Sequence, residues 1–203
     1  MDRLYWLGVQ TIMPGWGRRA WAMIEYFGTV KDFWSAPESE ILAYPSGSRE
    51  ARERLALRRN SLDLIKEEEK IKNAGMTYVT IKDKNYPEDL KHIPDPPPAL
   101  FVRGNIEING YAIAIVGSRK ATPYGLMVAE TLSRDLAKAG LIIVSGLARG
   151  VDTAAHRGTL SVNGKTIAVL GCGLNVAYPR ENRRLMDDIV AKGGAVISEF
   201  PLG

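Results

Sequence analysis

The sequence predicts an α/β protein in which a Rossmann-like, doubly wound parallel sheet follows a small all-α domain. Two observations predict this class. After residue 110, continuous apolar runs that suit strands covered on both faces alternate with helical segments. Before residue 75, apolar residues recur at helical spacing and no run alternates with a period of two. The 203 residues, 45% hydrophobic and 25% charged, have the composition of a globular protein.

Residues 1–75 are expected to form the helical domain. Trp21, Ile24 and Phe27 recur at helical spacing, and Pro14-Gly15-Trp16-Gly17 separates two short helical stretches. An amphipathic, charged pattern predicts one long helix over residues 48–73. Its arginines are expected on a solvated face with pairing four residues apart. They are Arg49, Arg52, Arg54, Arg58 and Arg59.

Residues 76–109 are expected to connect the two parts and to lead into the sheet domain. Strands are predicted at residues 76–81 and 99–102. Between them, Asp95-Pro96-Pro97-Pro98 is expected to be extended and stiff, because consecutive prolines fix φ and lack a backbone donor.

Residues 110–203 are expected to form the Rossmann-like domain. Pro123 suits the first turn of a helix that Thr122 caps, and Gly140 suits its end. Strands and helices alternate, which predicts a parallel sheet with right-handed crossovers. The strands are expected at residues 112–116, 141–144, 166–170 and 195–197, and the helices at 123–138, 152–160 and 181–191.

Composition and charge exclude several classes of protein. No apolar run is long enough to span a bilayer, and the N-terminus lacks the pattern of a secretory signal. A single cysteine and two histidines leave no disulfide framework or zinc site, so we expect a cytoplasmic protein without metal or cofactor. Residues 110–203 hold 11 basic and 7 acidic side chains, and so carry the whole net charge of +4. This excess is a weak indication of a polyanionic ligand.

The candidate site lies where the predicted parallel strands end. In an open parallel sheet, ligands bind beyond the carboxyl ends of the strands. Glycines there let a phosphate approach backbone N–H groups, hydroxyls donate hydrogen bonds, and arginines form charge-assisted bonds to phosphate oxygens. The residues that follow the first three strands are Gly117, Ser118 and Arg119, then Ser145, Gly146, Arg149 and Gly150, then Gly171 and Gly173. Ser198 and Glu199 follow the fourth strand.

Other chemistries are poorly supported at these strand ends. The sequence from Gly171 has Val176 where the dinucleotide fingerprint needs glycine or alanine, and no P-loop sequence is present. Cys172 lacks a nearby base and is better explained as a small apolar filler. A catalytic group of Ser145, His156 and Asp152 lacks a nucleophile-elbow sequence.

Linked motifs in the C-terminal part of the chain resemble one protein family. The segments GSRKATPYG, SGLARGVDTAAH, GCGLNVAYPREN and SEFPLG, preceded by NYPEDLKHIPDPPPALFVRGN, are similar in order and spacing to the DNA-processing protein A (DprA/Smf) family. The resemblance covers residues 80–203. Residues 1–75 resemble the family's small sterile-alpha-motif or helix-hairpin-helix domain, with PGWG in the hairpin position.

The resemblance implies a non-catalytic, homodimeric protein that binds and protects single-stranded DNA during natural transformation and helps to load a RecA-type recombinase. By matching positions, Gly117–Arg119 would hold a backbone phosphate and Ser145–Gly150 would form a second wall. A further cation would come from Arg180, Arg183 or Arg184, and Tyr124, Tyr178 and Phe200 are candidates for stacking on bases. The family's domain continues beyond Gly203, so this chain is expected to be incomplete, with its dimer surface in doubt and an open sheet edge after Ile197.

Two other functions remain open. The first is a nucleotide-processing hydrolase of the lysine-decarboxylase-like family, which shares this Rossmann variant. Its PGGxGTxxE loop is absent, and Glu199 is the only acidic residue at a matching strand end. The second is an adaptor whose helical half recruits a partner.

Overall fold

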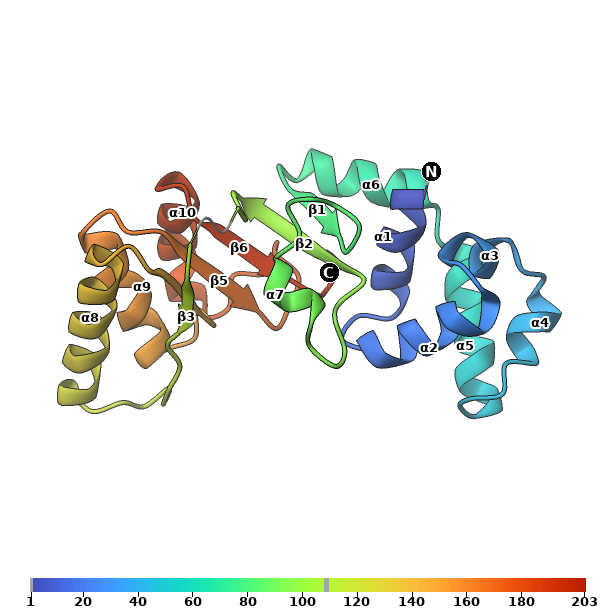
Figure 1. Ribbon diagram of the computed structural model, residues 1–203, viewed down its shortest axis with the longest axis horizontal. Coiled ribbons are helices and arrows are strands. Elements are labelled where there is room, and N and C mark those ends of the chain that lie inside the picture. The colour runs from blue at the N-terminus through green and yellow to red at the C-terminus, as the bar shows by residue number, and fades with distance from the viewer. Residues whose placement is uncertain (1, 108–109) are drawn as a thin grey trace.

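The computed structural model describes residues 2–107 and 110–203 and shows an elongated molecule (Figure 1). Residue 1 and residues 108 and 109, the last two of the predicted connecting segment, lie outside the described residues. The N-terminal helices occupy one end, helices α8 (Pro123–Lys138) and α9 (Val151–Ser161) lie at the other, and the strands lie between them. In the described parts of the chain, no helix has the length and apolar character needed to cross a bilayer.

The N-terminal part is helical, as predicted. Its helices are α1 (Asp2–Ile12), α2 (Gly17–Phe27), α3 (Val30–Ser35), α4 (Glu38–Leu42), α5 (Arg49–Ser61) and α6 (Leu64–Asn73). The single helix predicted over residues 48–73 is wrong, because the chain turns between α5 and α6. The Asp63 carboxylate accepts hydrogen bonds from the backbone N–H groups of Ile65 and Lys66, and this cap starts a new helix.

The arginine cluster of α5 is only partly on a solvated face. Arg49 pairs with Glu53 one turn away, as predicted. Arg59 is buried, which contradicts the prediction for this residue. Its guanidinium donates to the carbonyl oxygens of Phe33 and Ala36, at 2.9 and 2.6 Å. Arg59 therefore satisfies the carbonyl groups at the end of α3 and joins that helix to α5.

One mixed sheet forms the centre of the molecule. Its strands are β1 (Thr77–Thr80), β2 (Ala99–Gly104), β3 (Ala112–Ala114), β4 (Ile142–Ser145), β5 (Thr166–Leu170) and β6 (Ala195–Ser198), in the spatial order β1-β2-β6-β5-β4-β3. The pairs among β3, β4, β5 and β6 are parallel, whereas β2 is antiparallel to both β1 and β6. The two strands of the connecting segment thus extend the sheet itself. The α/β class and the helical N-terminal part are confirmed.

The crossover helices cover one face of the parallel strands. They are α8 (Pro123–Lys138), α9 (Val151–Ser161) and α10 (Arg183–Ala191), and η1 (Arg180–Asn182) precedes α10. Ile143 packs among residues of α8 and α9, and Val196 packs with residues of α9 and α10. On the other face, Val102 and Ile167 pack with Tyr86 of the segment that contains α7 (Glu88–Lys91). The two hydrophobic layers hold the strand ends in place.

The prediction that the first parallel strand is buried on both faces is wrong. All three residues of β3 are exposed, and Val116 beyond its end is 71% exposed. The reason is strand order, because β3 lies at an edge and, among the described residues, pairs only with β4. The predicted open edge after Ile197 is also wrong, since β6 is paired on both sides.

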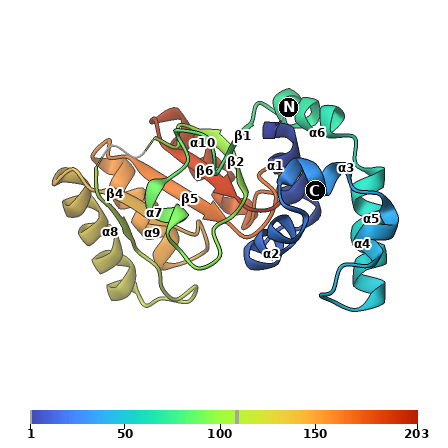
Figure 2. The same cartoon turned by 45° about the vertical axis from the view of Figure 1, so that its right-hand side comes forward.

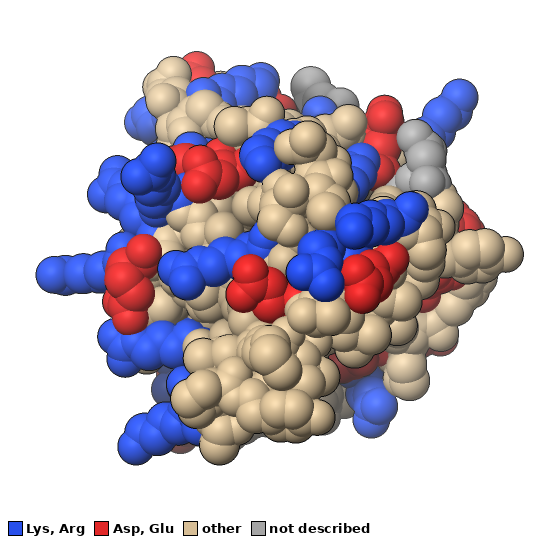
Figure 3. All heavy atoms as spheres, turned by 90° about the vertical axis from the view of Figure 1, so that its left-hand side faces the viewer, with Lys and Arg blue, Asp and Glu red and all other residues tan. Residues whose placement is uncertain are grey.

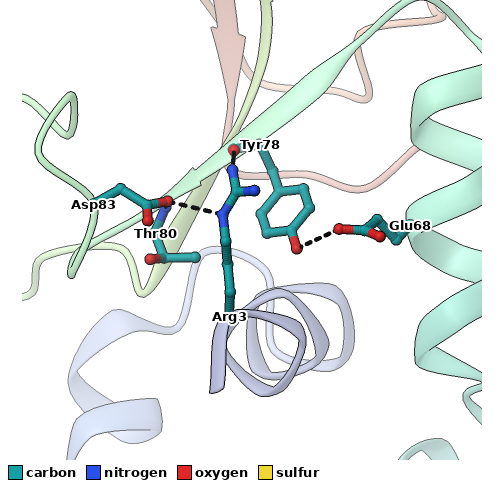
Figure 4. A network of polar contacts seen from close by, with 5 residues as sticks. All are labelled: Arg3, Glu68, Tyr78, Thr80 and Asp83. Atoms are coloured by element: carbon teal, nitrogen blue, oxygen red, sulfur yellow. Dashed lines mark hydrogen bonds and ion pairs between the residues drawn. The ribbon is translucent and has the colours of Figure 1, made fainter. Parts of the chain in front are cut away.

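Polar contacts join the helical part to the sheet (Figure 4). Arg3 of α1 donates to the backbone carbonyl of Tyr78 at 2.6 Å and pairs with Asp83 at 3.1 Å. The Tyr78 hydroxyl donates to Glu68 of α6 at 2.9 Å. Leu7 of α1 also shares a hydrophobic cluster with sheet residues. Figure 2 shows α1 and α6 beside β1 and β2. The division at residue 75 stays a prediction.

Candidate nucleic-acid interface

The first two strand ends form a continuous rim because their loops touch. Gly150 adopts φ +80°, and a Cβ atom there would collide with the carbonyl oxygen of Ser118 and lie 3.0 Å from the Cα of Arg119. The N–H of Val151 donates to the same oxygen at 3.2 Å. A Cβ atom on Gly117 would lie 2.8 Å from the side chain of Val151. Glycine at positions 117 and 150 thus permits the contact that places the loops of Arg119 and Arg149 on one rim.

The rim exposes the first loop to solvent. Gly117, Ser118 and Arg119 are all exposed. The Ser118 hydroxyl oxygen accepts a hydrogen bond from the N–H of Lys120 at 3.1 Å, which shapes the turn. Arg119 forms no ion pair or hydrogen bond with any residue that the structure describes. Its guanidinium therefore carries an uncompensated charge at the rim.

Two polar side chains, the buried Asn182 and the half-buried Thr153, hold the second loop in place. Asn182 donates to the Leu147 carbonyl at 2.9 Å and to the Thr153 hydroxyl oxygen at 2.7 Å. The Thr153 hydroxyl donates to the Ala148 carbonyl at 2.6 Å. A Cβ atom on Gly146 would lie 2.7 Å from an Asp152 oxygen, which leaves no room for a side chain. Asn182 and Thr153 were not predicted from the sequence. Thr153 comes just after the Gly146–Gly150 turn, which is a usable signal for a loop anchor, whereas Asn182 carries no such local signal.

Arg149 is exposed at the rim, but it is not free. Its guanidinium pairs with Glu181 of η1, and this ion pair lowers the pKa of the Glu181 carboxyl. The pair places η1 beside the second loop, so that the exposed Arg180 and Arg183 flank it. A phosphate bound at Arg149 would have to displace or share this carboxylate. Arg184 lines a hollow with Arg157 and Asp188, which Glu181 also borders.

The ends of β5 and β6 differ in the space that they leave for a ligand. Gly171 is exposed, and a Cβ atom there would meet nothing within 4 Å. Gly173 is buried, and a Cβ atom there would collide with the Pro201 carbonyl oxygen, so this glycine is needed for packing. The Ser198 hydroxyl donates to the Cys172 carbonyl at 2.8 Å, which fastens these two strand ends together. Of the two glycines, only Gly171 offers open space to a ligand.

Ser145 does not present its hydroxyl at the surface. The side chain is buried and donates to the Ile115 carbonyl at 2.6 Å, so it ties β4 to the end of β3. His156 of α9 is also buried and contacts Thr166 through Nδ1 at 2.8 Å. Asp152 instead contacts the N–H of Ala148. The three residues considered as a catalytic group thus have separate partners. Cys172 packs against the core, and burial raises the pKa of its thiol.

The candidate stacking residues lie on the surface. Tyr124 and Tyr178 are 71% and 60% exposed, whereas Phe200 is 36% exposed. Phe200 lies beside Gly15 of the PGWG turn, where a Cβ atom would be 3.7 Å from its ring. Figure 3 views the molecule from the α8 end and shows Lys and Arg side chains interspersed with Asp and Glu, above an area without charges. Lys and Arg side chains therefore do not form one continuous basic surface on the face of the molecule shown in Figure 3.

Burial of His156 predicts a measurable pH dependence of stability. Burial lowers its pKa to about 4 from 6.5, against a smaller opposing contribution from the Ser145 backbone. The unfolded chain therefore takes up a proton below pH 6.5, whereas the folded protein does so only near pH 4. The stabilisation is fully present above pH 6.5, and we expect the free energy of unfolding to fall by about 3 kcal/mol from this group between pH 7 and pH 4.

Urea unfolding of His156→Asn at both pH values checks this expectation. The variant is less stable throughout because the site is buried, but its loss between pH 7 and pH 4 should be smaller than that of the parent protein by about 3 kcal/mol. Equal losses in the two proteins would contradict a neutral, buried imidazole.

Comparisons with known proteins agree with this architecture. The family model for DNA recombination-mediator protein A matches residues 77–203. A protein Smf from Synechocystis is 34% identical over 210 residues, which cover 100% of this chain and 52% of that protein. A protein Smf from Escherichia coli is 46% identical over 58% of this chain and 32% of its own length. The chain thus spans about half or less of these relatives.

Two solved structures are similar to this one. The X-ray structure of DNA processing protein A from Streptococcus pneumoniae gives a TM-score of 0.74 at 32% identity, covering 97% of this chain and 67% of that one. The second is DNA processing protein A from Helicobacter pylori, reported for its single-stranded DNA binding mode. It gives a TM-score of 0.53 at 35% identity, covering 61% of this chain and 56% of that one. The family model and these relatives agree, and the chain therefore belongs to the DNA recombination-mediator protein A (DprA/Smf) family.

Proposed function

We propose that this chain binds the sugar-phosphate backbone of single-stranded DNA along the rim formed by the loops after β3 and β4. The observation that carries the proposal is the exposed guanidinium of Arg119, which pairs with no residue that the structure describes, on a loop that contacts Gly150 of the next loop. Charge-assisted bonds from arginine to phosphate are strong, and a glycine-rich turn lets the nucleic-acid chain come close to the protein backbone.

Each predicted site residue takes a distinct part in this proposal. Gly117, Ser118 and Arg119 would contact one phosphate, and Gly146, Arg149 and Gly150 would form the adjacent wall. Gly171 leaves space at the third strand end, and Tyr178, Arg180 and Arg183 are exposed near the second loop. Ser145 and Gly173 would act by holding the loops, because both are buried. Contacts to the sugar-phosphate backbone do not distinguish one base from another, so base preference is expected to be slight.

The wider role follows the family. We propose that the protein protects incoming strands in the cytoplasm during transformation, acts as a homodimer, lacks catalytic turnover, and helps to load a RecA-type recombinase. The description of the family as recombination mediators supports this role. The single-strand binding mode described for the Helicobacter pylori relative supports the choice of ligand.

Fluorescence anisotropy of a labelled oligonucleotide tests the proposal. The protein is titrated into single-stranded and duplex forms of the same sequence at two salt concentrations. We expect tighter binding to the single strand and a steep loss of affinity with salt, because phosphate contacts release counterions. Salt-independent binding would contradict the proposal. Release of free base from nucleoside monophosphates would instead support the hydrolase alternative.

Glu181 is expected to restrain DNA binding through its ion pair with Arg149. Glu181→Gln removes a carboxylate from the rim and frees the guanidinium, so affinity for a single-stranded oligonucleotide should rise about two- to fivefold at low salt. The same anisotropy titration measures the effect. Glu130→Gln makes the same change of charge at an exposed position of α8 and serves as the control. A loss of affinity in Glu181→Gln would mean that the pair positions Arg149 for binding.

A further inference from the structure

A second candidate binding surface lies in the helical part. A groove of about 610 Å³ runs between α2 and α5 and reaches the end of α1. Its lining residues all lie between positions 12 and 58, so none belongs to the loops after β3 and β4. We call it the α2–α5 groove.

The floor of the α2–α5 groove is apolar and fixed. Ile12, Met13 and Met23 belong to the buried core of the helical part, and Leu55 packs against that core. Trp16 stands at the rim with half of its surface exposed, and the Arg19 guanidinium lies 4.8 Å from the centre of its ring. Apolar side chains at the base of an open groove favour a partner that also has an apolar face.

The rim of the groove is strongly and uniformly basic. Its charged residues are Arg18, Arg19, Arg52, Arg54 and Arg58, and no carboxylate of the described residues lines it. Arg52 and Arg58 donate to the backbone carbonyls of Tyr44 and Ile12, which positions both side chains without neutralising them. None of the five arginines forms an ion pair with a described residue. Because such a cluster repels itself, it favours an acidic partner.

We propose that the α2–α5 groove binds an acidic amphipathic helix of a protein partner. Such a helix places apolar side chains at positions i, i+3, i+4 and i+7 on the floor, and its flanking glutamates and aspartates meet the arginines on both rims. The floor favours a peptide over a nucleic-acid strand because Ile12, Met13, Met23 and Leu55 are aliphatic. Of the two aromatic side chains that line the groove, Trp16 is covered by the Arg19 guanidinium and Tyr44 packs against Phe27, so they form no continuous platform for successive bases.

A labelled model peptide tests this proposal on the full chain. The probe is a helical peptide with leucines along one face and glutamates on its flanks. A scrambled peptide of the same composition and an analogue with lysine in place of glutamate serve as controls. We expect the acidic amphipathic peptide alone to bind, with a dissociation constant on the order of micromolar that rises with salt. Equal binding of the scrambled peptide, or no binding of any peptide, would overturn the proposal.

Two variants separate charge from shape. The double variant Arg18→Glu/Arg54→Glu reverses exposed charges on both rims and should weaken peptide binding about tenfold or more. Ala22→Trp fills the groove from an exposed position without changing charge and should also weaken binding. The double variant Lys31→Glu/Lys84→Glu, at two exposed positions outside the groove, is the matched charge control. Circular dichroism confirms that each variant is folded.

Oligonucleotide binding distinguishes the two surfaces. The groove variants should retain the affinity of the parent protein for a single-stranded oligonucleotide, and a thymidine oligonucleotide should not displace the peptide. If the double variant lost oligonucleotide binding as well, the groove would be part of the nucleic-acid site and the proposed protein partner would be wrong. If oligonucleotide binding failed at the strand-end rim while the peptide still bound, only the proposed DNA function would fall.

Discussion

Replacement of Arg119 by alanine is expected to weaken binding of a single-stranded oligonucleotide by about tenfold or more at low salt, since charge-assisted hydrogen bonds are worth about 1.5–3 kcal/mol. Arg119 is exposed and has no carboxylate partner among the described residues, so its charge is fully available to a phosphate. The slope of log affinity against log salt should also fall by about one, because one fewer phosphate is neutralised. Anisotropy titrations at several salt concentrations measure both quantities.

Arg134→Ala is the matched control for Arg119→Ala. It also removes an arginine side chain, but from α8, where Arg134 pairs with the neighbouring Asp135. Its affinity and salt slope should stay close to those of the parent protein. If Arg119→Ala left both quantities unchanged, or if Arg134→Ala lowered them equally, the rim would not be the phosphate-binding surface.

Replacement of Gly150 by valine is expected to have the largest effect on stability. The residue has φ +80° and ψ −129°, a region that is favourable only for glycine, and any Cβ atom would collide with the Ser118 carbonyl. The two loops would have to separate, and the N–H of Val151 would lose its acceptor. We expect a loss of about 3 kcal/mol or more in the free energy of unfolding, together with weaker oligonucleotide binding.

Gly140 provides a control for backbone strain alone. It has φ +89° at the end of α8, but a Cβ atom there would meet no atom within 4 Å. Gly140→Ala should therefore cost only about 1–2 kcal/mol and leave oligonucleotide binding unchanged. Gly150→Ala, which adds the same atom at the loop contact, should cost clearly more. Urea unfolding compares the two, and equal losses would show that the loops after β3 and β4 do not touch as described.

Elements with local signals could be predicted from the sequence. The helix over residues 123–138 and the strand over 166–170 have the predicted bounds. Thr122 caps that helix by accepting the N–H of Gly125, and Pro123 occupies its first turn, so the boundary depends only on neighbouring residues. The turn at Asp63 was also a local signal, but the amphipathic pattern that continues through it concealed the break.

Features that depend on strand order could not be predicted. The apolar run at residues 112–116 has the composition of a buried strand, yet it forms an edge. The antiparallel β2 lies between β1 and β6, and this arrangement depends on contacts between residues about 100 positions apart. Periodicity reports which residues are apolar, whereas strand order decides which of them are covered.

The candidate site was predictable in position and less so in detail. Because strands of a parallel sheet end at one side, the sequence was sufficient to expect the loops of Arg119 and Arg149 near each other. It did not show that Glu181 neutralises Arg149, or that Ser145 is buried beneath the loops. Both depend on neighbours that come from other elements. A glycine at a strand end, such as Gly173, can likewise be needed only for packing against Pro201.

Amide hydrogen exchange, followed by mass spectrometry with and without a thymidine oligonucleotide, tests the central claim most directly. If the rim binds the sugar-phosphate backbone, peptides that contain residues 117–120 and 146–150 should exchange more slowly with the single strand bound, and those of α2 and α5 should not change. Protection confined to the helical part, or no protection at either loop under conditions where the oligonucleotide is bound, would contradict the account.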